Sequence, residues 1–557
     1  MSSRAGGVLA CLLALGICMG AGAQVPAIPA GALPAAPEPT GAPTWEALEA
    51  SGAVLSGVEI RPLQVFDLAD PIEDSWVGRL ADRIHIQTRP GVIRDALLFQ
   101  PGDRVNARLI HESERALRAF RFVKEARVRP VVDAAGVHAI VEVQDAWTLK
   151  PSVSYDQVGG QRSWSWQVKE QNLFGSGKTL DIGREQRPER STTSFLYSDP
   201  QFFGGRWTLD LGYQVLSDGW ARSFQVERPF FSLQTPWAFS AKGQSSWSTF
   251  KEYDGNREVY TAPARLDEVD IKGGPGFWEG GLSAWRIQLL LTARQAAYGP
   301  LEALEPGALR APDLRPRRFR GAGLAWNYLQ DRYGDYHNLA AVRVTENYNL
   351  GWDLELDLGA YRRSLGSLVD APFFRASVAK GWAPGPGSLW LFRIKGEGRH
   401  EPGGWQDSRT TASLTGYRQG PGLQTFAVNL ALDLALRPDP EHLLYIGGTD
   451  GLRGYENHLH PGDRRWVLTA EDRILTPWVW FWGILQVGFV GFVDAGALRR
   501  LDGGGWTRTY ADVGGGFRFG DLKSSLGHVV LVTLAVPLTR EPGQERWQLV
   551  VGNEIRF

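Results

Sequence analysis

Apolar and polar residues alternate along successive short segments from about residue 148 to the C-terminus. In one such segment the apolar face is formed by Trp207, Leu209, Leu211, Tyr213 and Val215. A period of two is that of a β-strand, whose successive side chains point to opposite faces. Gly, Asp, Pro and Asn separate the segments, as turns require. The pattern therefore predicts a mainly β region of about 20 strands over residues 148–557.

A strand with one apolar and one polar face also occurs in soluble β-sandwiches. Two features favour a membrane barrel. The polar faces carry Gly, Ser, Asp and Gln, which would line a wet lumen. Aromatic residues cluster near strand ends, as at the interfaces of a transmembrane barrel; they are Phe202, Phe203, Phe230, Phe231, Trp478, Trp480, Phe481 and Trp482. Because an open sheet edge in lipid leaves backbone groups unpaired, such a sheet must close.

The connections between the segments support an even number of strands, which returns both termini to one side of the membrane. Connections assigned to the outside include long ones at residues 251–262, 298–317 and 445–463. Those assigned to the inside are mostly short, with residues 331–345 as the exception.

The region before the barrel follows a different pattern, which predicts a small α+β domain at residues 81–146. Its predicted order is β-α-α-β-β, with elements at residues 84–86, 92–98, from Asn106 as an N-cap, 126–131 and 137–143. Residues 45–80 form an ambiguous lead-in, in which residues 58–60 and 65–68 are candidates for further short strands.

The first residues indicate export. Arg4 precedes an apolar run too short to span a bilayer, and Ala21-Gly22-Ala23 predicts a cleavage site, so residues 1–23 are expected to be a signal peptide. Residues 24–44 are rich in Pro and Ala and are expected to be a tether. Both cysteines of the chain, Cys11 and Cys18, fall inside the predicted signal. The mature chain would then lack a disulfide scaffold, a thiolate metal site and a cysteine nucleophile.

Composition narrows the function classes further. The formal net charge is −1, so no basic footprint indicates nucleic-acid binding. The chain has 66 glycines and 22 tryptophans with 22% charged residues, a balance expected of an outer-membrane barrel or an extracellular β-repeat protein. No constellation of catalytic residues stands out. His442, His458 and His460 are interpreted as solvated loop histidines, because no carboxylate cluster with ligand spacing accompanies them in the sequence.

One motif carries a specific resemblance. Residues 447–455, Gly-Gly-Thr-Asp-Gly-Leu-Arg-Gly-Tyr, resemble the (V/L)-R-G-(F/Y) motif of the BamA/TamA outer-membrane assembly and two-partner-secretion superfamily, the bacterial surface antigen family. The resemblance implies a loop, containing Arg453, Gly454 and Tyr455, that folds back into the barrel and is followed by five strands. It also implies acidic partners for the arginine on the next two strands, for which this sequence offers Glu471 and Asp494. A buried arginine needs such partners, because an isolated buried charge is unfavourable.

Further sequence features resemble those of the same superfamily. Residues 172–178 and 199–203 resemble its first two periplasmic turns, and Phe557 ends the chain as its assembly signal does. The N-terminal α+β domain then corresponds to one POTRA domain. The sequence departs from the superfamily in having one such domain, and in a strand count above its usual number. The expected fold is mainly β: a closed antiparallel transmembrane barrel preceded by one POTRA-like domain. The barrel is expected to have sixteen or more strands, and a direct count of the segments gives about 20.

The resemblance implies an outer-membrane protein assembly or translocation factor with its POTRA domain in the periplasm. It would be a non-enzymatic, monomeric barrel without cofactor or metal, in contact with outer-membrane lipid, unfolded client polypeptides and, as candidate partners, periplasmic chaperones. Two alternatives stay open: a two-partner exporter of one dedicated cargo, and a passive outer-membrane channel or receptor. A soluble extracellular β protein is a more distant alternative.

The mechanism expected of an assembly or translocation factor has two parts. An exposed edge of the POTRA-like sheet, at residues 126–131 or 84–88, would pair with an extended client segment. The barrel would act at the seam between its first and last strands. Pro151 lies in the first strand and cannot donate a ladder hydrogen bond, so we expect it to weaken the seam.

Overall fold

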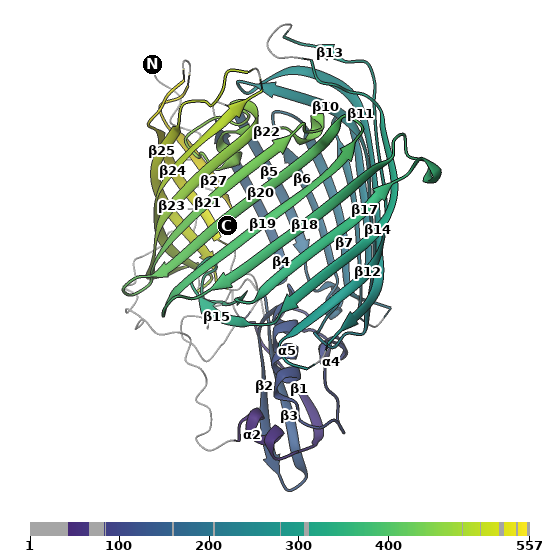
Figure 1. The fold of residues 1–557 in the computed structure, drawn as a ribbon. Coiled ribbons are helices and arrows are strands. Elements are labelled where there is room, and N and C mark those ends of the chain that lie inside the picture. The colour runs from purple at the N-terminus through teal and green to yellow at the C-terminus, as the bar shows by residue number, and fades with distance from the viewer. Residues whose placement is uncertain are drawn as a thin grey trace.

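The alternating segments of the sequence form a closed antiparallel β-barrel, and a smaller α+β domain lies against one end of it (Figure 1). The computed structural model describes residues 43–65, 79, 83, 85–158, 161–203, 206–278, 280–305, 311–481, 483–501, 503–522, 529–541 and 544–553. The predicted signal peptide, the predicted tether up to residue 42, and Phe557 therefore lie outside the described residues. We call the end of the barrel next to the α+β domain the domain end, and the opposite end the far end.

The barrel contains twenty long strands within the described residues, in agreement with the literal count from the sequence. They are β4 (Leu149–Val158), β5 (Gln161–Glu170), β6 (Thr179–Gln186), β7 (Ser191–Phe202), β8 (Trp207–Leu216), β9 (Gly219–Arg228), β10 (Trp237–Asp254), β11 (Arg257–Phe277), β12 (Ser283–Tyr298), β14 (Arg317–Gln330), β17 (Trp352–Tyr361), β18 (Ala371–Trp382), β19 (Ser388–Glu401), β20 (Gly404–Gln419), β21 (Gln424–Leu436), β23 (His460–Trp480), β24 (Leu485–Arg500), β25 (Tyr510–Asp521), β26 (Val529–Pro537) and β27 (Gln548–Asn553). Two short strands, β13 (Glu302–Ala303) and β22 (Leu444–Ile446), extend the sheet at the far end.

The seam of the barrel is sparsely paired. Among the described residues, β27 and β4 share a single bridging pair, Leu549 with Gln157, whereas β26 and β27 pair from Val530 to Ala535. Pro151 pairs with Val168 of β5, and residues 554–557 on the other side of the seam lie outside the described ranges. The expected role of Pro151 at the seam thus stays a prediction.

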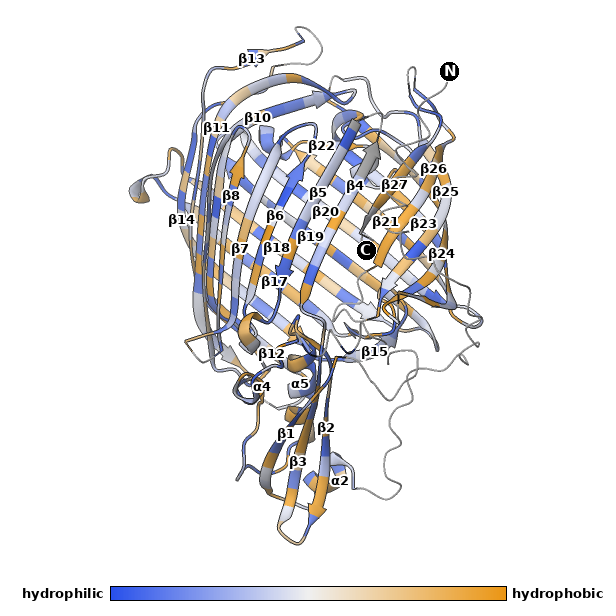
Figure 2. Cartoon of the chain, turned by 180° about the vertical axis from the view of Figure 1, so that it is seen from behind, coloured by the Kyte–Doolittle hydropathy of each residue, from blue (hydrophilic) through white to orange (hydrophobic). Residues whose placement is uncertain are grey.

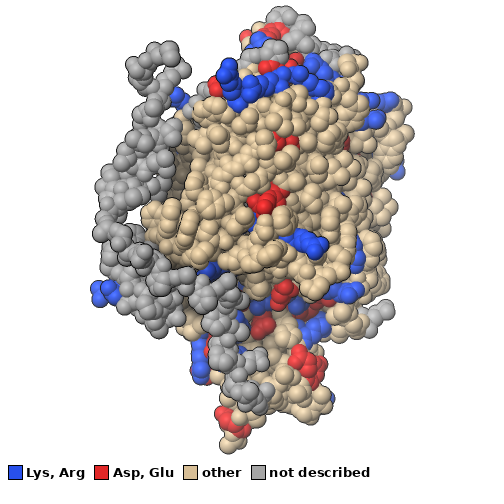
Figure 3. Space-filling model, turned by 90° about the vertical axis from the view of Figure 1, so that its left-hand side faces the viewer, with Lys and Arg blue, Asp and Glu red and all other residues tan. Residues whose placement is uncertain are grey.

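The predicted alternation places apolar side chains outside and polar ones inside. Leu211, Tyr213 and Val215 of β8 are all more than 40% exposed on the outer face, and Asp494 of β24 is fully buried inside. Figure 2 shows the alternating colours along the strands, and on the face drawn in Figure 3 charged residues gather toward both ends of a largely uncharged band. With aromatic residues such as Trp480 at strand ends, these are the properties of an outer-membrane β-barrel. None of the helices among the described residues has the length and apolar character needed to cross a membrane.

Two predicted connections differ from expectation. Residues 251–262 are largely strand, because β10 and β11 continue to a tight turn at Gly255 and Asn256, whose φ angles are +59° and +60°. Two consecutive residues with positive φ match the twist of the flanking strands, and Gly and Asn are the residue types that adopt positive φ most readily, which explains why they occupy this turn. The long inner connection after β14 is a separate hairpin of β15 (Tyr333–His337) and β16 (Thr345–Asn349).

The N-terminal domain begins earlier than the sequence indicated. Among the described residues its named elements are α2 (Trp45–Ala50), β1 (Leu55–Leu63), α4 (Pro90–Ala96), α5 (Ala107–Arg118), β2 (Val123–Asp133) and β3 (Gly136–Asp145). The sheet order is β1-β3-β2, with β1 parallel and β2 antiparallel to the central β3. The order β-α-α-β-β is therefore present, but its first strand lies in the lead-in at residues 45–80. The predicted strand at residues 84–86 is wrong, since residues 85–89 form no regular element and Ile84 lies outside the described residues.

The domain is tied to the first turns of the barrel. Asp145, at the end of β3, accepts hydrogen bonds from the Thr88 backbone N–H and hydroxyl, both at 2.8 Å. Thr88 in turn accepts one from the side chain of Asn172 at 2.9 Å. Gly177, whose φ is +70°, approaches Phe122 so closely that a Cβ would lie 2.7 Å from its ring. The residues of the 172–178 turn thus serve to dock the domain.

We expect a charge on the outer face to disturb the barrel more than a charge in the lumen. Leu211→Arg, in the middle of β8, should lower the free energy of unfolding in lipid vesicles by about 2–4 kcal/mol. Gln214→Arg on the same strand, whose side chain lines the lumen cavity, should have little effect. Urea titration of the heat-modifiable band measures both; equal losses in the two variants would contradict the assigned faces.

Candidate functional site

The loop between β21 and β23 folds back into the barrel from the far end. Its short β22 pairs with the start of β23, and a turn of 3₁₀ helix, Gly448–Asp450, ends at Gly451 with a left-handed φ of +100°. Leu452 and Tyr455 have no exposed surface. As the motif implied, five strands follow the loop, and its arginine lies among strands β23 and β24.

Arg453 is held by two carboxylates and a ring. Its Nε and Nη2 donate to the two oxygens of Asp494, at 2.7 and 2.8 Å, and its Nη1 donates to Glu471 at 2.7 Å. The guanidinium also lies 3.5 Å from the centroid of the Phe492 ring. Both acids are at most 3% exposed, so the arginine compensates charges that would otherwise be buried alone. The structure brings together the three charged residues that the sequence proposed.

Gly454 and Tyr455 fix the loop against the neighbouring strands. A Cβ at Gly454 would lie 2.6 Å from the Cβ of Asp512, so this close approach admits only glycine. The Tyr455 hydroxyl lies 2.8 Å from the carbonyl oxygen of Ala511 and 2.7 Å from that of Thr539, and it accepts the Ala511 N–H at 3.0 Å. These contacts give the motif a structural role in positioning the loop.

The sequence reasoning missed one member of this network, Arg473. It is 2% exposed and donates to the second oxygen of Glu471 through Nε, at 2.8 Å. Its position two residues after Glu471 on β23 is the signal that was available, because residues i and i+2 of a strand share a face. Glu471 therefore bridges two arginines.

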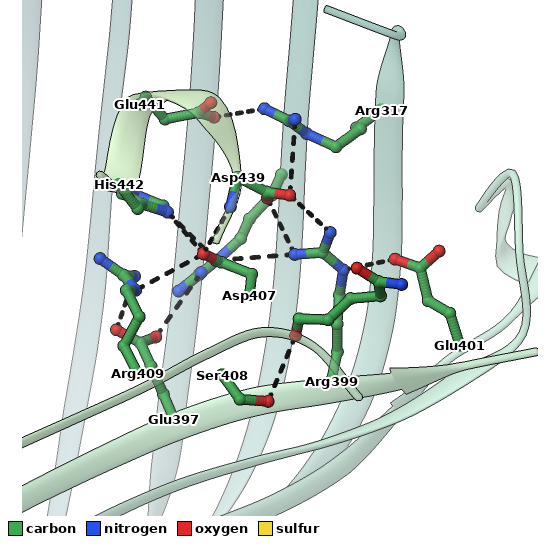
Figure 4. Close-up of polar contacts among 12 residues, drawn as sticks. Arg317, Glu397, Arg399, Glu401, Asp407, Ser408, Arg409, Asp439, Glu441 and His442 are labelled. Atoms are coloured by element: carbon green, nitrogen blue, oxygen red, sulfur yellow. Dashed lines mark hydrogen bonds and ion pairs between the residues drawn. The ribbon is translucent and has the colours of Figure 1, made fainter. Parts of the chain in front are cut away.

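A second polar network lines the lumen near the far end (Figure 4). Arg399 of β19 donates to both oxygens of Asp439, at 2.9 and 2.8 Å, and lies 3.6 Å from Asp407. Arg317 pairs with Glu441. These residues border a polar cavity of about 790 Å³ inside the barrel. The cavity confirms that the inward faces line an open lumen in this part of the molecule.

The interpretation of the histidines needs correction. His442 is not a solvated loop residue, because its Nδ1 lies 3.0 Å from Asp407. Asp407, Asp439 and His442 offer ligand atoms within 4.8 Å of one another, a cluster formed by β20 and by the loop that follows β21. Both carboxylates are already paired with Arg399, so we interpret the cluster as an ion-pair network.

The other two histidines also have partners near the loop. His458 stacks on Tyr253 with ring centroids 4.5 Å apart, and burial lowers its pKa. His460 lies 3.2 Å from Asp254. Both histidines connect the loop to β10, and no local sequence pattern indicates these contacts.

Removing Arg453 should destabilise the barrel strongly. Arg453→Ala leaves Glu471 and Asp494 buried without their cation, and we expect a loss of about 3–5 kcal/mol. Arg453→Lys should be intermediate, because it keeps the charge and loses the bidentate geometry. The measurement is the temperature at which the folded band disappears in electrophoretic heat-modifiability.

The matched control is Arg508→Ala, which removes a half-exposed arginine paired with Glu541 at the far end. It should leave the stability of the barrel nearly unchanged, because an exposed ion pair is screened by solvent. Wild-type heat-modifiability in Arg453→Ala would count against the assigned role of the loop.

Comparison with known proteins gives structural similarities at low identity. No family profile and no curated protein matches the chain. Similar solved structures include BamA from Haemophilus ducreyi lacking POTRA domains 1–3, with 12% identity, a TM-score of 0.36, and coverage of 89% of this chain and 85% of that chain. CdiB from Acinetobacter baumannii has 12% identity, a TM-score of 0.40 and coverages of 89% and 73%. CdiB from Escherichia coli has 13% identity, a TM-score of 0.41 and coverages of 89% and 75%.

Proposed function

We propose that this chain is an outer-membrane protein assembly or translocation factor. Its N-terminal domain acts as a POTRA domain in the periplasm, and its barrel inserts or exports unfolded polypeptides without catalysing a covalent reaction. The observation that carries the proposal is the inward loop, with Arg453 clamped by Glu471 and Asp494, which is the arrangement expected from the motif.

The N-terminal sheet leaves one edge open to a client, and it is not the edge suggested by the sequence. At residues 126–131 of β2, the Val128 N–H donates to Glu114 at 2.7 Å, and the Val128 carbonyl accepts from Trp45 at 2.8 Å. Pro130 lacks an N–H altogether. This edge is therefore closed to strand addition.

The opposite edge is β1. Among the described residues, no backbone hydrogen bond joins Gly57–Leu63 to any element other than β3. Glu59 and Arg61 on this strand are about half exposed. We therefore assign client binding by strand addition to β1, where backbone groups remain available except at Pro62, which has no N–H, and where many sequences can be accepted.

Insertion of a client measures the function directly. Proteoliposomes carrying the purified chain should fold a urea-denatured outer-membrane barrel several-fold faster than liposomes with an unrelated barrel, as followed by protease protection. Arg453→Ala should lose this acceleration and Arg508→Ala should keep it. Ion conductance without client folding would overturn the proposal in favour of a channel, and export of one cargo alone would favour a dedicated exporter.

The client edge can be located with single cysteines, since both native cysteines lie in the predicted signal peptide. Arg61→Cys on β1 and Arg127→Cys on β2 replace exposed arginines on opposite edges of the same sheet. A thiol-reactive photo-cross-linker should capture the denatured client from position 61 and not from position 127. The reverse result would return the edge to β2, and equal capture would contradict strand addition at a defined edge.

A further inference from the structure

The hairpin after β14 enters the barrel at the domain end, where Figure 1 shows β15. The tip between its strands, residues 338–344, has the sequence Asn-Leu-Ala-Ala-Val-Arg-Val. Leu339, Ala341 and Val342 have no exposed surface. An apolar tip of this kind would be unfavourable in water, so its burial is the reason for its position inside the barrel.

The wall beneath the tip is largely apolar. Leu339 packs in one cluster and Val342 in another. The inward residues of the wall in these clusters are Leu389, Tyr417, Ala427, Leu475, Val490, Val529 and Leu531. Inward faces of wide barrels are normally polar because they meet water. An apolar inner wall therefore requires an apolar cover, and the tip provides it.

Two arginines of the wall hold the tip by its backbone. Arg473 donates from Nη1 to the Leu339 carbonyl at 2.8 Å, and Arg518 of β25 donates from Nη2 to the Ala340 carbonyl at 2.7 Å. The backbone N–H groups of Leu339 and Ala340 donate to the Glu346 carboxylate within the hairpin, at 2.8 and 3.0 Å. A contact between a guanidinium and a backbone carbonyl does not depend on the side chain of the residue that supplies the carbonyl. Another polypeptide segment can therefore take the same place.

The hairpin is not part of the barrel sheet. In the described chain, β15 and β16 pair with each other and with no barrel strand. A two-stranded hairpin is marginally stable by itself. Leaving the wall would break side-chain contacts and the two arginine bonds, while Arg473 would keep its bonds to Glu471. It would also break the bonds from Gln419 to the His337 carbonyl, at 2.8 Å, and from Thr425 to the Asn338 carbonyl, at 3.0 Å. Displacement therefore leaves the barrel's own hydrogen bonds intact.

The N-terminal domain contacts the hairpin at its start and beside its tip. Arg115 of α5 pairs with Asp331 at 3.1 Å and lies over the Tyr333 ring. The Thr345 hydroxyl donates to Glu125 of β2 at 3.3 Å. A movement of the domain would thus be transmitted to the hairpin at its first strand and at the residue that follows its tip.

We propose that the apolar wall of β19–β26 at the domain end is a binding site for an extended apolar polypeptide segment, which the hairpin tip occupies at rest as a plug. The incoming segment takes over the apolar contacts of Leu339 and Val342 and the carbonyl contacts of Arg473 and Arg518. The identity of that segment as a client rests on the proposed function. The plug itself does not.

The plug is tested by single-channel conductance of the full chain in planar bilayers. Leu339→Asp/Val342→Asp places two charges against the apolar wall and should raise the open-channel conductance several-fold. The matched control, Leu365→Asp/Leu368→Asp, alters two exposed leucines in a far-end connection and should conduct as wild type. Wild-type conductance in the folded tip variant would overturn the proposal.

A cross-link keeps the test decisive if the tip variant fails to fold. A Cβ built at Gly520 would lie 2.6 Å from the Cβ of Val342. Disulfides place these atoms about 3.8 Å apart, so Val342→Cys/Gly520→Cys needs only a small outward shift of the tip. The oxidised protein should show no spontaneous opening events, and reduction should restore the events seen in wild type. Openings that are unaffected by the disulfide would also overturn the proposal.

The binding site is tested with a synthetic peptide of residues 336–346. Added to the Leu339→Asp/Val342→Asp variant, it should close the channel, whereas the same peptide carrying the two aspartates should not. Failure of the native peptide to close the channel would overturn the binding site. A protein that gates and binds the peptide, but inserts no client in proteoliposomes, would retain this inference and lose the proposed function.

Discussion

One carboxylate, Glu471, joins the two segments that fill this barrel. One of its oxygens accepts from Arg453 of the far-end loop, and the other accepts from Arg473, which in turn donates to the hairpin tip at the domain end. Because the Glu471 side chain is 3% exposed, its buried negative charge must be compensated by the arginines. Loss of either arginine would remove part of that compensation. Loop and hairpin are therefore fastened to the same strand from opposite ends of the lumen.

The need for this arrangement follows from the width of the barrel. Twenty strands enclose a space too wide for their own side chains to fill. Part of that space is a polar cavity lined by ion pairs such as Arg399 with Asp439, and part is filled by chain. Around the β23–β26 wall the filling is specific: charges hold the loop, and apolar contacts hold the hairpin. The seam of β27 and β4, which is sparsely paired among the described residues, begins at the strand that follows β26, so the filled part of the lumen lies next to the seam.

Local patterns of the sequence predicted much of this. Dyad alternation depends on neighbouring residues alone, and it located the barrel strands, including five after the motif. The same period made Glu471 and Asp494 inward residues, so that the arginine motif had recognisable partners. Asn106 was a valid N-cap, since its side chain accepts from the Leu109 N–H at 3.1 Å. Each of these features is fixed within a few residues of the chain.

Other features were decided by contacts between distant segments. β1 contains Gly57 and Pro62, which weaken its strand pattern, and it forms because β3, far along the chain, offers a parallel partner. The apolar tip at residues 338–344 looked like an inner connection of unusual length, and its place became clear only with the apolar wall it covers. His442 gained a partner, Asp407, from another strand. The sequence by itself thus determined which face of each strand is polar, because that choice is local. Only the tertiary structure decided what fills the lumen, because closure of the barrel sets which distant side chains meet there.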